Sequence, residues 1–305
     1  MRVRAAVVQA ASVGFDRELS LAKLERLVAD AAREGAQLAV FPEAFISAYP
    51  KGLDFGASVG NRTDAGRDHF RRYFESAIEV PGPDVDRIGE AAREHSIHLS
   101  VGVIERDGGT PYCTALLFGP EGVLLGKHRK LMPTAAERLV WGFGDGSTLP
   151  VVDTPLGRVG AEICWENYMP MLRMAMYAKG VQLYCAPTAD DRETWLSTIR
   201  HIALEGRCFV LSSCQFLRRS DLPSDIANRI SEVPEAILMR GGSAIIDPLG
   251  NVLAGPCFEG ETILCADLDL DQVARGKYDF DAAGHYSRPD VFQLKVNEEP
   301  QRPVS

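Results

Sequence analysis

Short apolar runs that are typical of buried β-strands alternate with amphipathic helical patterns along almost the whole chain. The run RAAVVQAA (4–11) precedes a helical pattern over 18–33, and the run AQLAVF (36–41) follows that pattern. The second half repeats the order with RVGAEI (158–163), a helical pattern over 169–179, VQLYCAP (181–187), a helical pattern over 193–206 and CFVLSS (208–213). This alternation predicts an α/β fold built from layers of sheet and helix.

The chain is long enough for two domains, but nothing in the sequence divides it. Its 305 residues can bury a large core. No low-complexity stretch or short repeat separates the halves, so we expect a single domain over 1–287. Within that domain, 51–68 and 217–235 are expected to form mobile or oligomer-facing loops. The polar, proline-containing segment 288–305 is expected to form a C-terminal arm or tail.

The charge of the chain argues against a function in nucleic-acid binding. It has 33 basic and 42 acidic side chains, a net charge of -9, and its basic clusters at 71–72 and 127–130 are short. No run approaches the roughly 18 apolar residues of a membrane span. The first apolar run leads directly into a helical pattern, which indicates a strand rather than a signal peptide. We therefore expect a cytoplasmic protein that binds neither nucleic acid nor membranes.

The cysteines argue against disulfide and zinc chemistry. There are seven, with no C-x-x-C pair, at positions 113, 164, 185, 208, 214, 257 and 265. An odd set of this kind fits reduced thiols, most of them inert core residues. His128 has no second histidine or carboxylate at ligand spacing in the sequence, so no metal site is expected.

Three residues whose side chains can take part in catalysis stand at or just beyond the ends of apolar runs. Glu43 follows LAVFP, Lys130 follows VLLGKHR, and Cys164 follows VGAEI. Strand ends are where α/β folds expose reactive groups, and a cysteine nucleophile needs a base or a cation to become thiolate-like. A helix that begins shortly after Cys164, with Pro170 in its first turn, would add partial positive charge. The alternatives are a core thiol and two surface residues.

The stretches around these residues are FPEAF (41–45), GKHRKLMPTAAERLVWGFGDG (126–146) and ICWENYMPMLR (163–173). Together with APTADDRETWLSTIRHIALEGRCFVLS (186–212) and GHYSRPDVF (284–292), they resemble the carbon-nitrogen hydrolase (nitrilase) superfamily, and within it the nitrilase branch. The resemblance implies a four-layer α-β-β-α sandwich that needs no cofactor. It also implies homodimers that pair through a helix surface and build larger or helical homo-oligomers.

Carried over by position, the resemblance implies a role for four side chains. Glu43 matches the general base, Lys130 the cationic stabiliser and Cys164 the nucleophile, while Glu137 matches an additional glutamate beside them. A salt bridge from Glu137 to Arg138 is the structural alternative. The implied reaction is hydrolysis of a nitrile to a carboxylic acid and ammonia through a thioimidate and a thioester.

The substrate is less constrained than the reaction. Tyr49, Trp165, Thr188 and Trp195 are expected to line the pocket, which favours aromatic nitriles or arylacetonitriles. An aliphatic nitrilase, an amidase or cyanide-hydratase-like enzyme, and a catalytically silent scaffold are the alternatives.

Two features depart from the nitrilase pattern. Glu162 stands where nitrilases more often have an apolar residue, and the chain ends soon after VFQLKV (291–296), which argues against extended spiral assembly.

Overall fold

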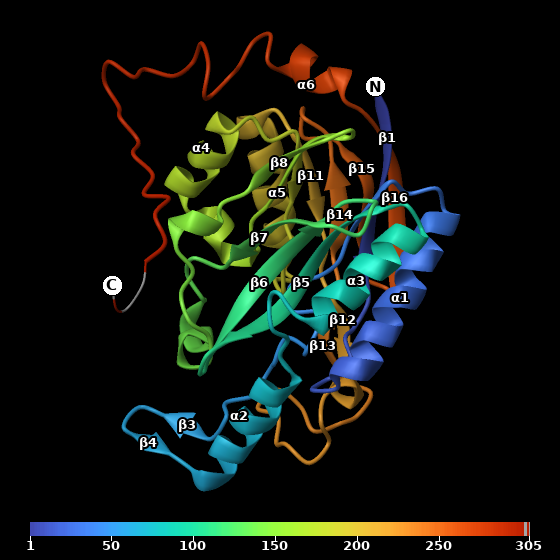
Figure 1. The fold of residues 1–305 in the computed structure, drawn as a ribbon, viewed down its shortest axis with the longest axis vertical. Coiled ribbons are helices and arrows are strands. Elements are labelled where there is room, and N and C mark those ends of the chain that lie inside the picture. The colour runs from blue at the N-terminus through green and yellow to red at the C-terminus, as the bar shows by residue number, and fades with distance from the viewer. Residues whose placement is uncertain (302–303, 305) are drawn as a thin grey trace.

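Two six-stranded sheets lie face to face in the computed structural model, which describes residues 1–301 and 304 (Figure 1). The first sheet has the order β16 (Thr262–Asp269), β1 (Arg2–Gln9), β2 (Leu38–Val40), β5 (His98–Asp107), β6 (Thr110–Phe118) and β7 (Leu124–Arg129). The second has the order β15 (Val252–Cys257), β14 (Ser243–Ile246), β11 (Phe209–Ser212), β10 (Leu183–Cys185), β9 (Gly157–Ala161) and β8 (Val151–Thr154).

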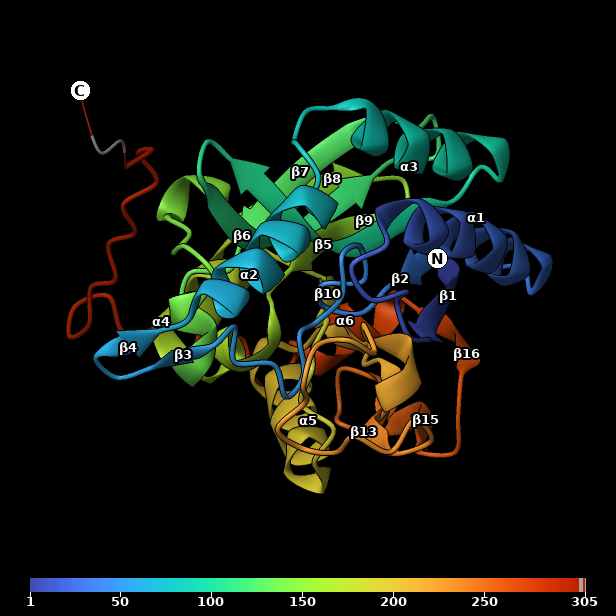
Figure 2. The ribbon, with the colours of Figure 1, turned by 90° about the horizontal axis from the view of Figure 1, so that it is seen from below.

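Helices cover the outer face of each sheet and complete four layers. The first sheet carries α1 (Arg17–Arg33) and α3 (Pro83–Glu94), and the second carries α4 (Pro170–Ala178) and α5 (Glu193–Gly206). Figure 2 shows α1 and α3 on one side of the molecule and α5 on the opposite side. The predicted α-β-β-α sandwich is therefore confirmed, and so are the helices predicted near 18–33, 169–179 and 193–206.

Strand β1 explains how the sheets come to be buried on both faces. Val7 packs into the core between the sheets, while its neighbour Val8 packs under α1 and α3. Successive side chains of a strand point to opposite faces, so a strand covered on both sides is an uninterrupted apolar run. This accounts for the sequence RAAVVQAA, and β1 pairs along its whole length with β16.

The remaining elements lie outside the two sheets. They are the hairpin β3 (Ala57–Ser58) and β4 (Asn61–Arg62), α2 (Asp64–Ser76), the pair β12 (Phe216–Arg218) and β13 (Ile237–Arg240), and α6 (Asp271–Gly276). The predicted loop over 51–68 is wrong in its last part, because α2 begins at Asp64. The Thr63 side chain caps this helix by accepting a hydrogen bond from the Gly66 N–H. Residues 288–301 form neither helix nor strand.

Parallel pairing places Glu43 and Cys164, from the two halves of the chain, after the carboxyl ends of strands. Strand β2 is parallel to β1 and β5, and Glu43 follows its carboxyl end. Strand β9 is parallel to β10, and Cys164 follows its carboxyl end. Ligand sites of α/β sheets lie at such carboxyl ends.

Candidate active site

Four side chains from separate segments meet between the sheets, and we call them the Lys130 cluster: Glu43, Lys130, Glu137 and Cys164. The ammonium of Lys130 lies 2.6 Å from Glu43 Oε1 and 2.8 Å from Glu137 Oε2. Glu43, Lys130 and Cys164 are all buried. The sequence therefore predicted residues that the fold does bring together.

The thiol of Cys164 is held at a strained turn. The Thr188 hydroxyl donates to Cys164 Sγ at 3.1 Å, and the Cys164 N–H donates to the Pro187 carbonyl oxygen at 2.8 Å. The backbone of Cys164 has φ +52°, in the left-handed region that a residue with a side chain adopts only at a cost. A 3₁₀ turn over Cys164–Tyr168 lies between the sulfur and α4, which begins at Pro170 as the sequence predicted.

The electrostatics of this cluster require a base. Burial raises the pKa of the Cys164 thiol well above its usual range, and the charge of Glu43 raises it further. Burial also raises the pKa of Glu43, against the opposing effect of Lys130. Although burial opposes its charge, the carboxylates beside Lys130 keep its pKa well above the usual value. The resting thiol is therefore protonated, beside a carboxylate that can accept its proton.

Glu43 has one oxygen available for that transfer. Its Oε1 is bound by Lys130 and lies 3.6 Å from the Cys113 sulfur. Its Oε2 is buried and has no hydrogen-bond partner within the described part of the chain. A buried carboxylate oxygen left without a donor costs folding free energy, and such groups are typical of sites that keep a polar atom for chemistry.

Glu137 faces Lys130 rather than Arg138. The Tyr49 hydroxyl donates to its Oε1 at 2.6 Å, and the Thr134 N–H donates to its Oε2 at 2.6 Å. The Arg138 guanidinium instead donates to the Pro133 carbonyl at 3.0 Å. The salt bridge weighed as the alternative for Glu137 is therefore not the contact that the fold provides.

A cavity of about 220 Å³ opens onto the sulfur. Its lining comprises Tyr49, Lys51, Thr134, Glu137, Cys164, Trp165, Ala189, Asp190, Asp191 and Arg192. An adjoining cavity of about 270 Å³ shares Tyr49, Lys51, Thr134 and Glu137 with it. The charged residues 190–192 follow the predicted strand 181–187, and the strand-end argument used for Cys164 could have identified them.

The four predicted pocket residues occupy different places. Tyr49 and Trp165 line the cavity, and Thr188 contacts the sulfur. Trp195 is only 2% exposed, its indole N–H donates to the Ser212 hydroxyl at 2.8 Å, and it is absent from the described cavity lining. Trp165 is fixed as a wall because its indole N–H donates to Asp190 at 2.7 Å.

A second buried group, which we call the His128 cluster, lies behind the first: His128, Glu162 and Glu166. His128 Nε2 is 2.7 Å from Glu166 Oε1 and 3.2 Å from Glu162 Oε2. Sequence spacing gave His128 no carboxylate partner, whereas the fold supplies two. Their ligand atoms lie within 4.8 Å of one another, but the 2.7 Å contact is a hydrogen bond.

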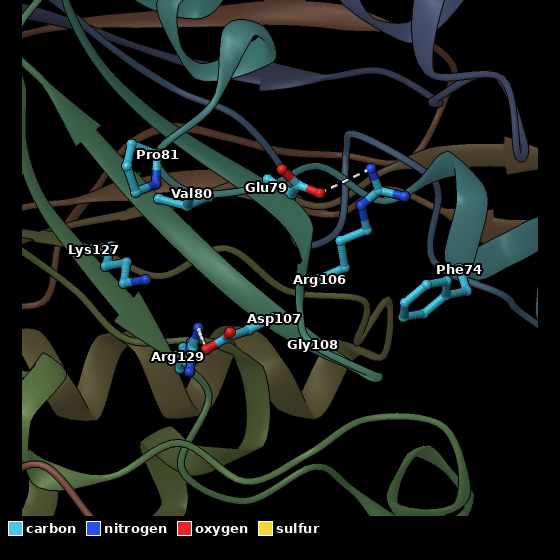
Figure 3. A pocket seen from close by; sticks show the side chains of 9 residues that line it. All are labelled: Phe74, Glu79, Val80, Pro81, Arg106, Asp107, Gly108, Lys127 and Arg129. Atoms are coloured by element: carbon cyan, nitrogen blue, oxygen red, sulfur yellow. Dashed lines mark hydrogen bonds and ion pairs between the residues drawn. The ribbon is translucent and has the colours of Figure 1, made fainter. Parts of the chain in front are cut away.

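The opposite face of β7 carries charged side chains that already have ion-pair partners. Lys127 and Arg129 point into a cavity of about 510 Å³ (Figure 3), and both form ion pairs with the buried Glu105 at 2.6 Å. In the same cavity Arg106 pairs with Glu79 at 3.0 Å. Each of these cations already has a carboxylate partner, and the lining of this cavity contains no cysteine, serine or threonine within the described residues.

Comparison with known proteins agrees with this geometry. The model of the Carbon-nitrogen hydrolase family matches residues 4–278. An aliphatic nitrilase of Sinorhizobium fredii (strain HH103) is 61% identical over 303 residues, covering 99% of this chain and 98% of that protein. A bifunctional nitrilase/nitrile hydratase of Lupinus angustifolius is 58% identical, covering 99% of this chain and 88% of that protein.

Solved structures share the fold at low sequence identity. The Caenorhabditis elegans NitFhit protein superposes with a TM-score of 0.75 at 23% identity, covering 99% of this chain and 69% of that one. A carbon-nitrogen hydrolase of Helicobacter pylori G27 has a TM-score of 0.75 at 19% identity, covering 95% and 97%. With a family match over most of its length and relatives near 60% identity, the chain belongs to the carbon-nitrogen hydrolase family and, within it, to the nitrilase branch.

Proposed function

We propose that this protein hydrolyses small organic nitriles to the carboxylic acid and ammonia, with Cys164 as the nucleophile. The observation that carries the proposal is the buried thiol of Cys164 beside a lysine paired with two carboxylates, one of which keeps an oxygen free. Relatives at 55 to 62% identity that are named nitrilases support the same class of reaction.

The first half of the reaction forms a thioimidate. Glu43 takes the proton of Cys164 as the sulfur attacks the nitrile carbon. One π bond of the nitrile breaks, and its electron pair moves to the nitrogen, which lies near Lys130 and takes the proton that Glu43 received, so that Glu43 is again a base. Lys130 stabilises this developing negative charge, and its pairing with Glu137 keeps it in place.

The second half releases the two products. Water, deprotonated by Glu43, adds to the thioimidate carbon, the nitrogen is protonated, and ammonia leaves to give a thioester. A second water then attacks the thioester carbon and releases the acid with the thiol restored. If the thiol leaves before ammonia does, the product is an amide instead. Relatives named bifunctional nitrilase/nitrile hydratase support both outcomes, so amide formation is the second candidate activity.

The cavity favours small polar nitriles over aryl ones. Its volume is about 220 Å³, and Lys51, Asp190, Asp191 and Arg192 contribute charge to its lining. Asp190 and Arg192 already pair with each other at 2.5 Å, but this charged lining suits a polar substituent better than an aryl ring. The aromatic preference expected from the sequence stays a prediction, and the aliphatic alternative has more support.

Assembly and location also stay predictions. Tyr168, Met169 and Met171 are exposed at the start of α4, and this apolar surface supports pairing of two copies through a helix face. Within residues 1–301 and 304, the structure contains no helix that is both long enough and apolar enough to cross a membrane.

The proposal is tested by assaying the purified protein against a panel of nitriles, with ammonia, acid and amide measured together. We expect ammonia release with small polar aliphatic nitriles, and Cys164→Ala should lower it by about 10⁴-fold or more. Cys208→Ala is the matched control, because Cys208 is equally buried but packs under α4 and α5. Wild-type turnover by the C164A protein would overturn the assignment of Cys164.

A further inference from the structure

The proposed reaction assigns no role to the three side chains of the His128 cluster. All three of its side chains are buried, and Glu162 is 0% exposed. Both oxygens of Glu162 are without a hydrogen-bond partner in the part of the chain that the structure describes. A buried carboxyl group without hydrogen bonds is destabilising, and the 3.2 Å contact with His128 offsets part of that cost.

Glu166 accepts hydrogen bonds from both segments that carry the reactive groups. Its Oε2 accepts a hydrogen bond from the Leu131 N–H at 2.8 Å, one residue after Lys130. Its Oε1 accepts one from the Ile163 N–H, one residue before Cys164. A single carboxylate thus joins the end of β7 to the nucleophile turn, and it can do so only while it is oriented.

His128 provides that orientation, and its contacts define its protonation. Its Nδ1 faces the carbonyl oxygen of Thr148, which can only accept a hydrogen bond. Its Nε2 faces carboxylate oxygens of Glu166 and Glu162. Both ring nitrogens must therefore donate, and a histidine that donates from both nitrogens is an imidazolium.

Glu162 completes the charge balance of this cluster. Burial lowers the pKa of His128, but the charges of Glu162 and Glu166 outweigh it and raise that pKa to about 10. Burial raises the pKa of Glu162 well above its usual range. While Glu162 is ionised, its negative charge 3.2 Å from Nε2 holds the proton on His128.

The other groups around Glu162 do not replace this function. Lys179, at the end of α4, acts on Glu162 from a distance, but its ammonium is already paired with Glu298 at 2.7 Å. Tyr184 of β10 donates its hydroxyl to Asn167 at 2.7 Å, and burial keeps the pKa of that phenol well above its usual value. His128 and Glu166 are therefore the partners that respond to Glu162.

We propose that Glu162 is a positioning residue for the cysteine nucleophile: it keeps His128 protonated at alkaline pH, so that Glu166 continues to tie the Lys130 segment to the Cys164 turn. The inference rests on the proposed function in that it assigns the same nucleophile. A metal ion on the same three side chains is the competing explanation, and the 2.7 Å hydrogen bond between His128 and Glu166 favours a proton.

The test compares Glu162→Gln with Glu105→Gln. Glu105 is also a buried carboxylate paired with cations of β7, but on the opposite face of the strand, away from Glu166. The readouts are kcat and KM for the best nitrile from pH 6 to 10.5. We expect E162Q to retain kcat at pH 7 within about twofold and to lose it with a midpoint about one pH unit or more below that of the wild type, with KM unchanged.

E105Q should leave that midpoint in place. The conservative variant Glu162→Asp restores a charge and should move the midpoint back toward the wild-type value. If E162Q does not fold, Glu162→Asp and Glu162→Leu give the same comparison between a retained and a lost charge. An unmoved midpoint in E162Q, or an equal shift in E105Q, would overturn the proposal.

A second readout does not depend on nitrile turnover. The rate at which iodoacetamide alkylates Cys164, followed by peptide mass spectrometry, should fall in E162Q relative to wild type over the same alkaline interval. If the wild type hydrolyses no nitrile but this ratio falls as expected, only the proposed function fails. Metal analysis of the purified wild type completes the test, because a stoichiometric metal that E162Q lacks would overturn the role given to the proton.

Discussion

The Lys130 cluster and the His128 cluster have nearly the same composition. Each contains one buried cation held between two carboxylates, and the two cations stand two residues apart at the end of β7. They differ in the hydrogen bonds that their carboxylates accept and in their access to a cavity. In the Lys130 cluster a glutamate oxygen is free and a cavity opens onto the sulfur. In the His128 cluster backbone N–H groups occupy Glu166, and all three side chains are sealed from solvent.

This difference shows that burial and charge pairing alone do not identify a reactive site. A reactive carboxylate needs an unoccupied oxygen, a partner whose proton it can take and space for a substrate. Glu166 shows the opposite case, since its oxygens already accept backbone hydrogen bonds from Leu131 and Ile163 and it holds the two segments in place. Equivalent substitutions in the two clusters should therefore act on different quantities.

Replacing Glu43 should produce the largest effect on chemistry. Glu43→Gln keeps the shape of the side chain and removes the base, so we expect kcat for the best nitrile to fall by about 10³-fold. Because the charge of Glu43 raises the pKa of the Cys164 thiol and Lys130 lowers it, the same change should lower that pKa, so kcat should fall without slower alkylation of Cys164 by iodoacetamide near pH 7. Steady-state kinetics and peptide mass spectrometry measure the two effects. A variant that keeps the wild-type kcat would show that Glu43 is not the base.

The pair Glu137→Gln and Glu166→Gln separates the clusters most directly. Glu137→Gln removes one of two anions beside Lys130 and weakens the hydrogen bonds from Tyr49 and Thr134. Because Glu137 is only half-buried, we expect kcat to fall by about 10- to 100-fold with a smaller loss of stability than in Glu166→Gln. Glu166→Gln breaks a buried ion pair and disturbs two backbone hydrogen bonds, so the free energy of unfolding should fall by about 3 kcal/mol. Urea denaturation beside kinetics measures both. Equal effects of the two changes on stability would remove the distinction.

The sequence predicted the Lys130 cluster because each member follows an apolar run or matches a motif. The His128 cluster escaped prediction, since His128 lies 34 residues from Glu162 and the contact exists only once β7 and β9 belong to facing sheets. Local spacing contains no information about that packing. The same reasoning explains why Glu162 had no assigned role.

Trp195 is a different case, because the sequence did contain the answer. Trp195, Ile199 and Ile202 recur at helical spacing in α5, and all three are buried in the core under the second sheet. The helical pattern thus predicted a core position more strongly than a pocket position. Helix α2 had a cap signal in Thr63 and Asp64, but few of its side chains are buried, so its apolar pattern was weak.

The half-buried Tyr49 and the buried Tyr184 provide the last comparison of the clusters. The Tyr49 hydroxyl donates to Glu137 in the Lys130 cluster, and the Tyr184 hydroxyl donates to Asn167 beside the His128 cluster. Each Tyr→Phe change removes one hydrogen bond worth about 1 kcal/mol.

In Tyr49→Phe that loss leaves Glu137 less well oriented toward Lys130, so kcat should fall by about fivefold, the rate equivalent of that energy. In Tyr184→Phe the loss should appear in the urea midpoint, with kcat unchanged, because Asn167 holds the backbone carbonyls of Glu162 and Cys164 through its other amide atom. A fall in kcat in Y184F as large as that in Y49F would mean that the His128 cluster contributes to the chemical step as directly as the Lys130 cluster.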